Sequence, residues 1–125
     1  MYTLTLLREF IAQHYLVGGD WGPENKLHSH SYRLEITLEG PSLDEHGYLL
    51  DLVALQRKMG ELISLYADRT LNELPAFLGL NPSLEHFSRV ACQFIAQDPS
   101  LRHLSSITAR IWENHDAWAS YRQDL

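Results

Sequence analysis

The sequence predicts an α+β fold, with an antiparallel sheet packed against two helices. Three observations lead to this class. Apolar side chains alternate over 2–16 and 28–39, as in half-buried strands. They recur at helical spacing over 52–66 and 84–95. Alternation returns over 105–113, and AWASYR can form a last strand. The order strand, strand, helix, helix, strand, strand is typical of an α+β domain.

The first two strands are predicted as a hairpin around a glycine-rich loop. The loop covers 17–27 and carries three glycines and one proline. On both sides of it the apolar residues fall on even positions, although Leu7, Ile11 and Tyr15 blur the first strand. The second strand is the cleaner one, because its odd positions are all polar.

Capping residues predict where the two helices begin. Asp51 is the expected N-cap of the first helix, and Gly60 inside that helix weakens it by about 1 kcal/mol. Ser83 is the expected N-cap of the second helix, where Glu85 favours the N-terminal dipole. The predicted buried stripe of the second helix is Leu84, Phe87, Val90, Ala91, Phe94 and Ile95, which leaves Cys92 on the polar side.

Length and composition predict one domain over residues 1–125. The chain has 125 residues, 45% of them hydrophobic, and a formal net charge of −6. An acidic chain argues against nucleic-acid binding, which needs a basic face. No apolar run reaches the roughly 18 residues of a membrane helix, and no secretory leader is visible. With one cysteine and therefore no internal disulfide, a cytoplasmic protein is expected.

Three histidines form the first candidate site. His28 and His30 share the apolar face of their strand, because residues i and i+2 point the same way. His14 ends the preceding strand in phase with its apolar residues, so the hairpin would bring the three imidazoles together. Such a set would leave one coordination position of a zinc ion open. Spacing alone leaves the alternative open that this is an ordinary surface His-x-His pair.

Three acidic residues complete the candidates. Glu113 follows the apolar residues of a strand face, where burying a carboxylate costs free energy unless it meets a donor such as a ligand N–H. The alternative is that Glu113 already lies in a solvent-exposed turn. Glu24 lies in the loop before the histidines, where a solvated role is the alternative. Asp68 follows the first helix and can be ordinary helix-end chemistry.

Several motifs in order resemble the 6-pyruvoyl-tetrahydropterin synthase family, which includes the 6-carboxytetrahydropterin synthases of queuosine biosynthesis. FIAQH (10–14) is similar to F-x-A-x-H, and HSHSY (28–32) to H-G-H-x-Y. GYLLDL (47–52), RTLNELP (69–75), NPSLEH (81–86) and IWE (111–113) resemble further family segments in the same order. No single motif is specific, but their order over nearly the whole chain is.

The resemblance implies a T-fold, whose four-stranded sheet carries two helices on one face and assembles as a trimer forming a β-barrel, with trimers pairing to hexamers. It implies Zn²⁺ bound by His14, His28 and His30. It also implies a pterin ring held by Glu113, and active sites between subunits. The implied substrate is 7,8-dihydroneopterin triphosphate.

The chain departs from the family in its proton-transfer residues. The family's loop cysteine is absent, and Glu24 stands four residues before His28, as in a subgroup that releases 6-hydroxymethyl-dihydropterin for folate synthesis. The family's Asp-His pair is also missing, and Asp68 is the residue expected to act in its place, although no histidine accompanies it. Ser29 replaces glycine between the two histidines, a milder change.

Two functions therefore remain. The first is a zinc-dependent lyase acting on a dihydropterin side chain, with Glu24 as proton-transfer residue. The alternative is a non-catalytic or re-purposed zinc-containing oligomer that binds a pterin or purine. A purely structural domain with incidental histidines ranks third and predicts no bound metal.

Overall fold

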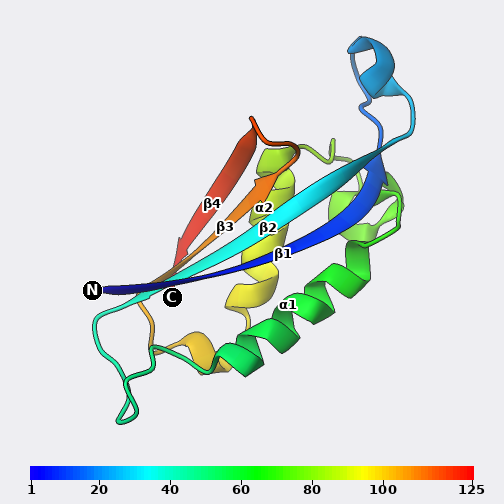
Figure 1. The fold of residues 1–125 in the computed structure, drawn as a ribbon. Coiled ribbons are helices and arrows are strands. Elements are labelled where there is room, and N and C mark those ends of the chain that lie inside the picture. Colours follow the sequence, from blue (N-terminus) through cyan, green and yellow to red (C-terminus); the bar gives the residue numbers. More distant parts are fainter.

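The computed structural model describes residues 1–125 as one four-stranded antiparallel sheet with two helices on one face (Figure 1). The sheet order is β1-β2-β3-β4, and every neighbouring pair is antiparallel. The elements are β1 (Tyr2–His14), β2 (His28–Gly40), α1 (Leu52–Tyr66), α2 (Leu84–Ala96), β3 (Ser106–Trp112) and β4 (Trp118–Asp124). The predicted class and element order are confirmed.

The β1–β2 hairpin is the longest pairing in the sheet. Its ladder runs from Tyr2 opposite Gly40 to His14 opposite His28. The connecting loop, with a short 3-10 turn at Gly22–Asn25, projects beyond the end of the sheet (Figure 1). The even-numbered residues are buried from Phe10 to His14 in β1 and from Tyr32 to Gly40 in β2, whereas His28 and His30 are partly exposed. The period-two pattern thus fixes which side chains reach the site.

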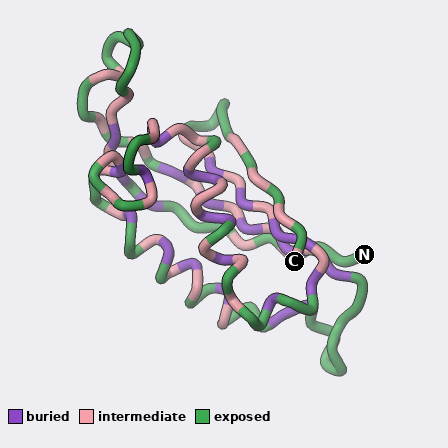
Figure 2. Tube along the Cα trace, turned by 180° about the vertical axis from the view of Figure 1, so that it is seen from behind, coloured by how far each residue is buried: buried purple, intermediate pink, exposed green.

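An aromatic cluster joins the sheet to the helices. Phe87 of α2 contacts four other rings edge-on, with centroid distances of 5.3 to 5.8 Å. Those rings belong to Phe10, Tyr32, Tyr66 and Phe77. Figure 2 shows the buried stretches of the strands and helices facing one another. Because this cluster lies next to the end of β1, its packing holds that end of the strand in place.

The buried face of α2 differs from the predicted one. Ser88 and Cys92 are fully buried, whereas Val90 and Phe94 are only partly buried. Cys92 Sγ lies 3.8 Å from the carbonyl oxygen of Ile107, so the helix approaches β3 through its small residues. The expectation that Cys92 lies on the polar side was wrong. Small side chains let the helix backbone come closer to the sheet than the bulky stripe would.

No helix combines the length and the apolar character that crossing a bilayer requires.

The cap of α1 gives a direct test of the fold. The Asp51 carboxylate accepts hydrogen bonds from the backbone N–H groups of Val53 and Ala54, at 3.0 and 3.3 Å. Asp51→Ala leaves these donors without their partner, and we expect it to lower the free energy of unfolding by about 1 kcal/mol. Urea denaturation measures the change. Asp51→Asn keeps an acceptor and should cost much less; equal losses for both variants would contradict the capping role.

Candidate metal centre

Three imidazoles converge where β1 ends and β2 begins. The ladder pairs His14 with His28 and Ala12 with His30, so all three rings project from the same face. Their centroids are 4.5 Å (His14–His28), 4.9 Å (His14–His30) and 4.8 Å (His28–His30) apart. The structure therefore brings together the three histidines that the hairpin geometry predicts as neighbours.

Backbone carbonyls orient two of the rings. The Nδ1 of His14 lies 3.2 Å from the carbonyl oxygen of Pro82, and the Nδ1 of His28 lies 2.6 Å from that of Lys26. A carbonyl only accepts, so each Nδ1 carries a proton, and in the neutral imidazole each Nε2 then keeps its lone pair. A hydrogen-bond acceptor at the other ring nitrogen of a metal-bound histidine fixes the tautomer in this way.

The three Nε2 atoms are buried and have no hydrogen-bond partner. Buried polar atoms are rarely left unsatisfied, so three together call for a specific explanation. Burial lowers the pKa of His14, and the neighbouring imidazoles add to this, although the bond to Pro82 partly opposes it. The neutral imidazole that this favours is the form that binds metals.

Glu24 faces the same cluster from the 3-10 turn. Its Oε2 lies 2.8 Å from the Nε2 of His28, yet the contact lacks hydrogen-bond geometry. Ligand atoms of Glu24 and the three histidines all lie within 4.8 Å of one another. A carboxylate facing nitrogen lone pairs is repulsive without a cation among them. Three imidazole nitrogens are a donor set that suits zinc and leaves one position open for substrate, so the residues present fit a divalent metal.

Glu113 lies at the edge of the cluster. It follows β3, and its backbone N–H donates to the carbonyl of Ala117, so it already belongs to the β3–β4 turn. Its carboxylate is nevertheless only partly exposed, and Oε1 lies 3.8 Å from the Nε2 of His30. A cavity of about 550 Å³ adjoins it, lined also by Arg33 and Trp112. A flat ligand could meet the Glu113 carboxylate from this cavity.

Asp68 is not brought to the cluster within one chain. Its oxygens are not among the ligand atoms grouped around the imidazoles. It adopts a left-handed conformation (φ 60°) just after α1, and its N–H donates to the carbonyl of Ile11 at 2.6 Å. It therefore lies along the outer edge of β1.

Sequence reasoning missed the part played by Tyr32 in the site. Its hydroxyl lies 3.5 Å from the Nδ1 of His14, and its ring is 1% exposed. Burial raises the pKa of Tyr32, and the Glu113 and Glu24 carboxylates add to the effect, so the phenol stays protonated. The period-two pattern placed Tyr32 on the histidine face and could have indicated it. Cys92, by contrast, is buried away from the site, and burial raises its pKa to about 11, so it supplies no thiolate.

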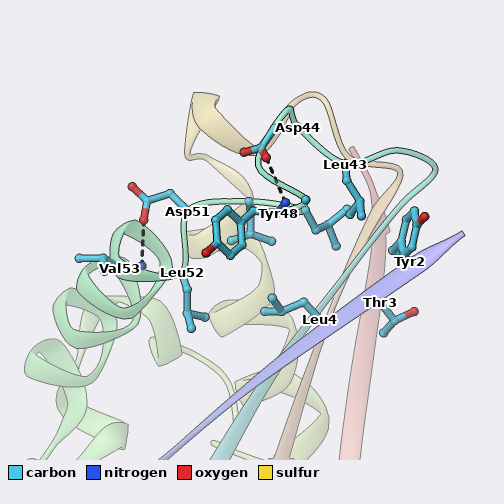
Figure 3. A pocket seen from close by; sticks show the side chains of 12 residues that line it. Tyr2, Thr3, Leu4, Leu43, Asp44, Tyr48, Asp51, Leu52 and Val53 are labelled. Atoms are coloured by element: carbon cyan, nitrogen blue, oxygen red, sulfur yellow. Dashed lines mark hydrogen bonds between the residues drawn. The ribbon is translucent and has the colours of Figure 1, made fainter.

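Another cavity lies at the other end of β1. It measures about 750 Å³ and is formed by the β1 N-terminus, the β2–α1 connection and the start of α1 (Figure 3). The carboxylates of Asp44 and Asp51 both bind backbone N–H groups there. Because its polar groups serve the backbone, this cavity holds no set of groups comparable to the histidine cluster.

Comparison with known proteins agrees with this geometry. The sequence profile of the 6-pyruvoyl tetrahydropterin synthase family matches residues 3–124. The chain therefore belongs to the 6-pyruvoyl tetrahydropterin synthase family. A search of curated proteins gave no significant match.

Solved structures share the fold at low sequence identity. The Caenorhabditis elegans 6-pyruvoyl tetrahydropterin synthase superposes with a TM-score of 0.82 at 21% identity, covering 98% of this chain and 96% of that one. A catalytic-residue mutant of the Plasmodium vivax enzyme, in which cysteine replaces glutamate, gives 0.77 at 16% identity with both chains fully covered. The unaltered Plasmodium vivax enzyme gives 0.79 at 14% identity, again over both full chains. The T-fold expected from the sequence is confirmed.

Removal of one imidazole tests the metal centre. We expect the untagged protein to bind about one zinc ion per chain, and His30→Ala to weaken binding by at least about 100-fold, because two imidazoles then remain. Competition with a chromogenic chelator measures the affinity. His46→Ala is the control, since His46 is exposed in the β2–α1 connection. Equal affinities for wild type and His30→Ala would contradict the assignment.

Proposed function

We propose that the protein is a zinc-dependent lyase acting on the side chain of a dihydropterin, with 7,8-dihydroneopterin triphosphate as the substrate. The observation that carries the proposal is the set of three buried, unpartnered Nε2 atoms facing the Glu24 carboxylate, in a chain of the pterin-synthase family. In this proposal His14, His28 and His30 hold the metal. Bound zinc would act as a Lewis acid that polarises the side-chain oxygens of the substrate.

Glu24 is the proposed proton-transfer residue. Its side chain is 45% exposed, so substrate can reach it, while Oε2 lies at the imidazoles. Glu24 would take the proton from the hydroxyl on the second side-chain carbon as the bond between the first and second carbons breaks. The deprotonated oxygen becomes the carbonyl of a two-carbon aldehyde, which leaves with the triphosphate. Glu24 would then return a proton to the carbon left on the ring, so 6-hydroxymethyl-dihydropterin is released. The glutamate called a catalytic residue in the Plasmodium vivax mutant supports a carboxylate in this role.

Glu113 is the proposed anchor of the pterin ring. Adjacent N–H groups on the ring would donate to its two oxygens, which would give this partly buried carboxylate two hydrogen-bond partners. The distance of 3.8 Å between Glu113 Oε1 and His30 Nε2 supports this role, because the proposed anchor and the proposed metal ligands are then neighbours. A ring held there would therefore present its side chain to Glu24.

Glu24→Gln tests the proton transfer. The substitution preserves shape but removes the basic oxygen, and we expect turnover to fall by at least about 100-fold while zinc content stays the same. Product formation by liquid chromatography and zinc by atomic absorption are the two measurements. Glu45→Gln is the matched control, because Glu45 is 86% exposed in the β2–α1 connection. Full activity of Glu24→Gln would show that another group moves the proton.

A closed oligomer is proposed to complete the site. The outer edge of β4 pairs with no strand, and that of β1 is covered only near its end, where Ile11 and Gln13 bond the backbone of Asp68 and Arg69. Leu7 and Ile11 on β1 are each 49% exposed. Joining β1 of one subunit to β4 of the next closes three sheets into a barrel. Asp68, on the outer edge of β1, would then serve as a proton relay toward the site of a neighbouring subunit.

Light scattering after size-exclusion chromatography tests the assembly. We expect a mass three or six times the chain mass of 14.4 kDa. A persistent monomer would contradict both the barrel and the role of Asp68 between subunits.

A second candidate is a zinc-containing pterin- or purine-binding oligomer without turnover. The observation in its favour is that Arg69, not histidine, follows Asp68, so the family's Asp-His pair is incomplete. Pterin binding that depends on zinc, with no product formed, would select this candidate.

A further inference from the structure

The chain segment after His14 has hydrogen-bond partners of an unusual kind. The ladder of β1 with β2 ends at His14, yet Tyr15 and Val17 remain fully paired. The amide of Asn72 accepts from Tyr15 N–H at 3.0 Å and donates to its carbonyl at 2.8 Å. The amide of Asn81 does the same for Val17, at 2.8 and 2.9 Å. Two side-chain amides thus replace a partner strand.

Leu16, between Tyr15 and Val17, is hydrogen-bonded to the turn that contains Glu24. Leu16 N–H donates to the backbone carbonyl of Glu24 at 2.9 Å. The Leu16 carbonyl accepts from the side-chain amide of Asn25 at 3.0 Å. Successive residues of an extended strand direct their hydrogen bonds to opposite edges. Asn72 and Asn81 therefore hold one edge of the segment 15–17. Leu16 bonds the backbone of Glu24 at the opposite edge.

The chemistry at Tyr15 and Val17 requires a carboxamide. A carboxamide offers an acceptor and a donor side by side, as a peptide group does, whereas a carboxylate only accepts. Aspartate at either position would lose the donated bond and set a negative charge against a carbonyl oxygen. Asn72 and Asn81 lie on different parts of the chain, but each pairs its side-chain amide with the N–H and carbonyl of one backbone residue.

The histidines are held by other means. His14 and His28 are paired within the β1–β2 ladder, and the Nδ1 of His14 is fixed by the backbone of Pro82. Glu24 lies outside the ladder, in the projecting loop, where its backbone is bonded to Leu16 and Trp21. The amide pairs should therefore govern the position of Glu24 much more than that of the imidazoles.

We propose that Asn72 and Asn81 are positioning residues: their side-chain amides clamp Tyr15–Val17 and so hold Glu24 against the histidine cluster. This inference rests on the proposed function for its catalytic consequence, but the clamp itself does not. The hydrogen bonds of both side-chain amides go to backbone groups of Tyr15 and Val17 and not to the imidazoles or the Glu24 carboxylate, so both amides act through the backbone of the loop.

Asn72→Asp and Asn81→Asp test the clamp. Hydrogen exchange at the Leu16 amide, followed by NMR, reports the clamp without any substrate, and we expect it to quicken by at least about tenfold. The kcat should fall by at least about tenfold, because a misplaced base loses its alignment, while KM changes by less than about threefold. Zinc affinity should stay within about threefold of wild type. Gln56→Glu makes the same amide-to-carboxylate change at an exposed position of α1 and should alter none of the three.

Each outcome decides something different. Unchanged exchange at Leu16 would overturn the clamp. Faster exchange with unchanged kcat would overturn the positioning of Glu24, and a parallel loss of zinc affinity would place the effect on the imidazoles instead. If wild-type protein turns over no dihydropterin, the proposed function fails. The clamp is then decided by exchange at Leu16, where faster exchange in both variants upholds it and unchanged exchange refutes it.

Discussion

The pairing of β1 with β2 is the constraint on which the candidate site depends. It sets His14 opposite His28 and Ala12 opposite His30, so three imidazoles meet at one end of one face. A shift of one residue would turn the side chains of β2 to the other face of the sheet. The buried residues further along both strands, such as Phe10 and Tyr32, oppose such a shift, because it would expose them. Packing of the core therefore fixes the geometry of the site.

The site combines a rigid part with a part that the loop supplies. Histidines on paired strands, with backbone carbonyls at two of their rings, form the rigid part. Glu24 comes from the projecting loop. Its position depends on the hydrogen bond of its backbone to Leu16 and, as proposed, on the side-chain amides of Asn72 and Asn81 that bind Tyr15 and Val17. In the proposed chemistry the rigid part holds the metal and the loop delivers the base. The two functions can then change separately, which agrees with a chain that has the histidines but lacks the family's loop cysteine.

Much of the fold and of the candidate site could be predicted from the sequence, because these features depend on hydrophobic periodicity and on helix-capping residues. The alternation in 28–39 indicated both the strand and the shared face of His28 and His30, and Asp51 and Ser83 cap the helices as predicted. Other features depend on contacts that periodicity does not contain. The burial of Cys92 follows from the close approach of α2 to β3, and the pairing of Asn72 and Asn81 with 15–17 joins segments more than 50 residues apart. The position of Asp68 on the β1 edge likewise follows from tertiary hydrogen bonds.

The most direct test of the proposed chemistry is a product analysis. Zinc-loaded, untagged protein would be incubated with 7,8-dihydroneopterin triphosphate, and every pterin formed would be identified by mass. Transfer of a proton by Glu24 with C–C cleavage predicts 6-hydroxymethyl-dihydropterin. A pyruvoyl or carboxy product would contradict that route and show that other residues perform the proton transfer. Unchanged substrate that remains bound would contradict catalysis and identify a pterin-binding protein.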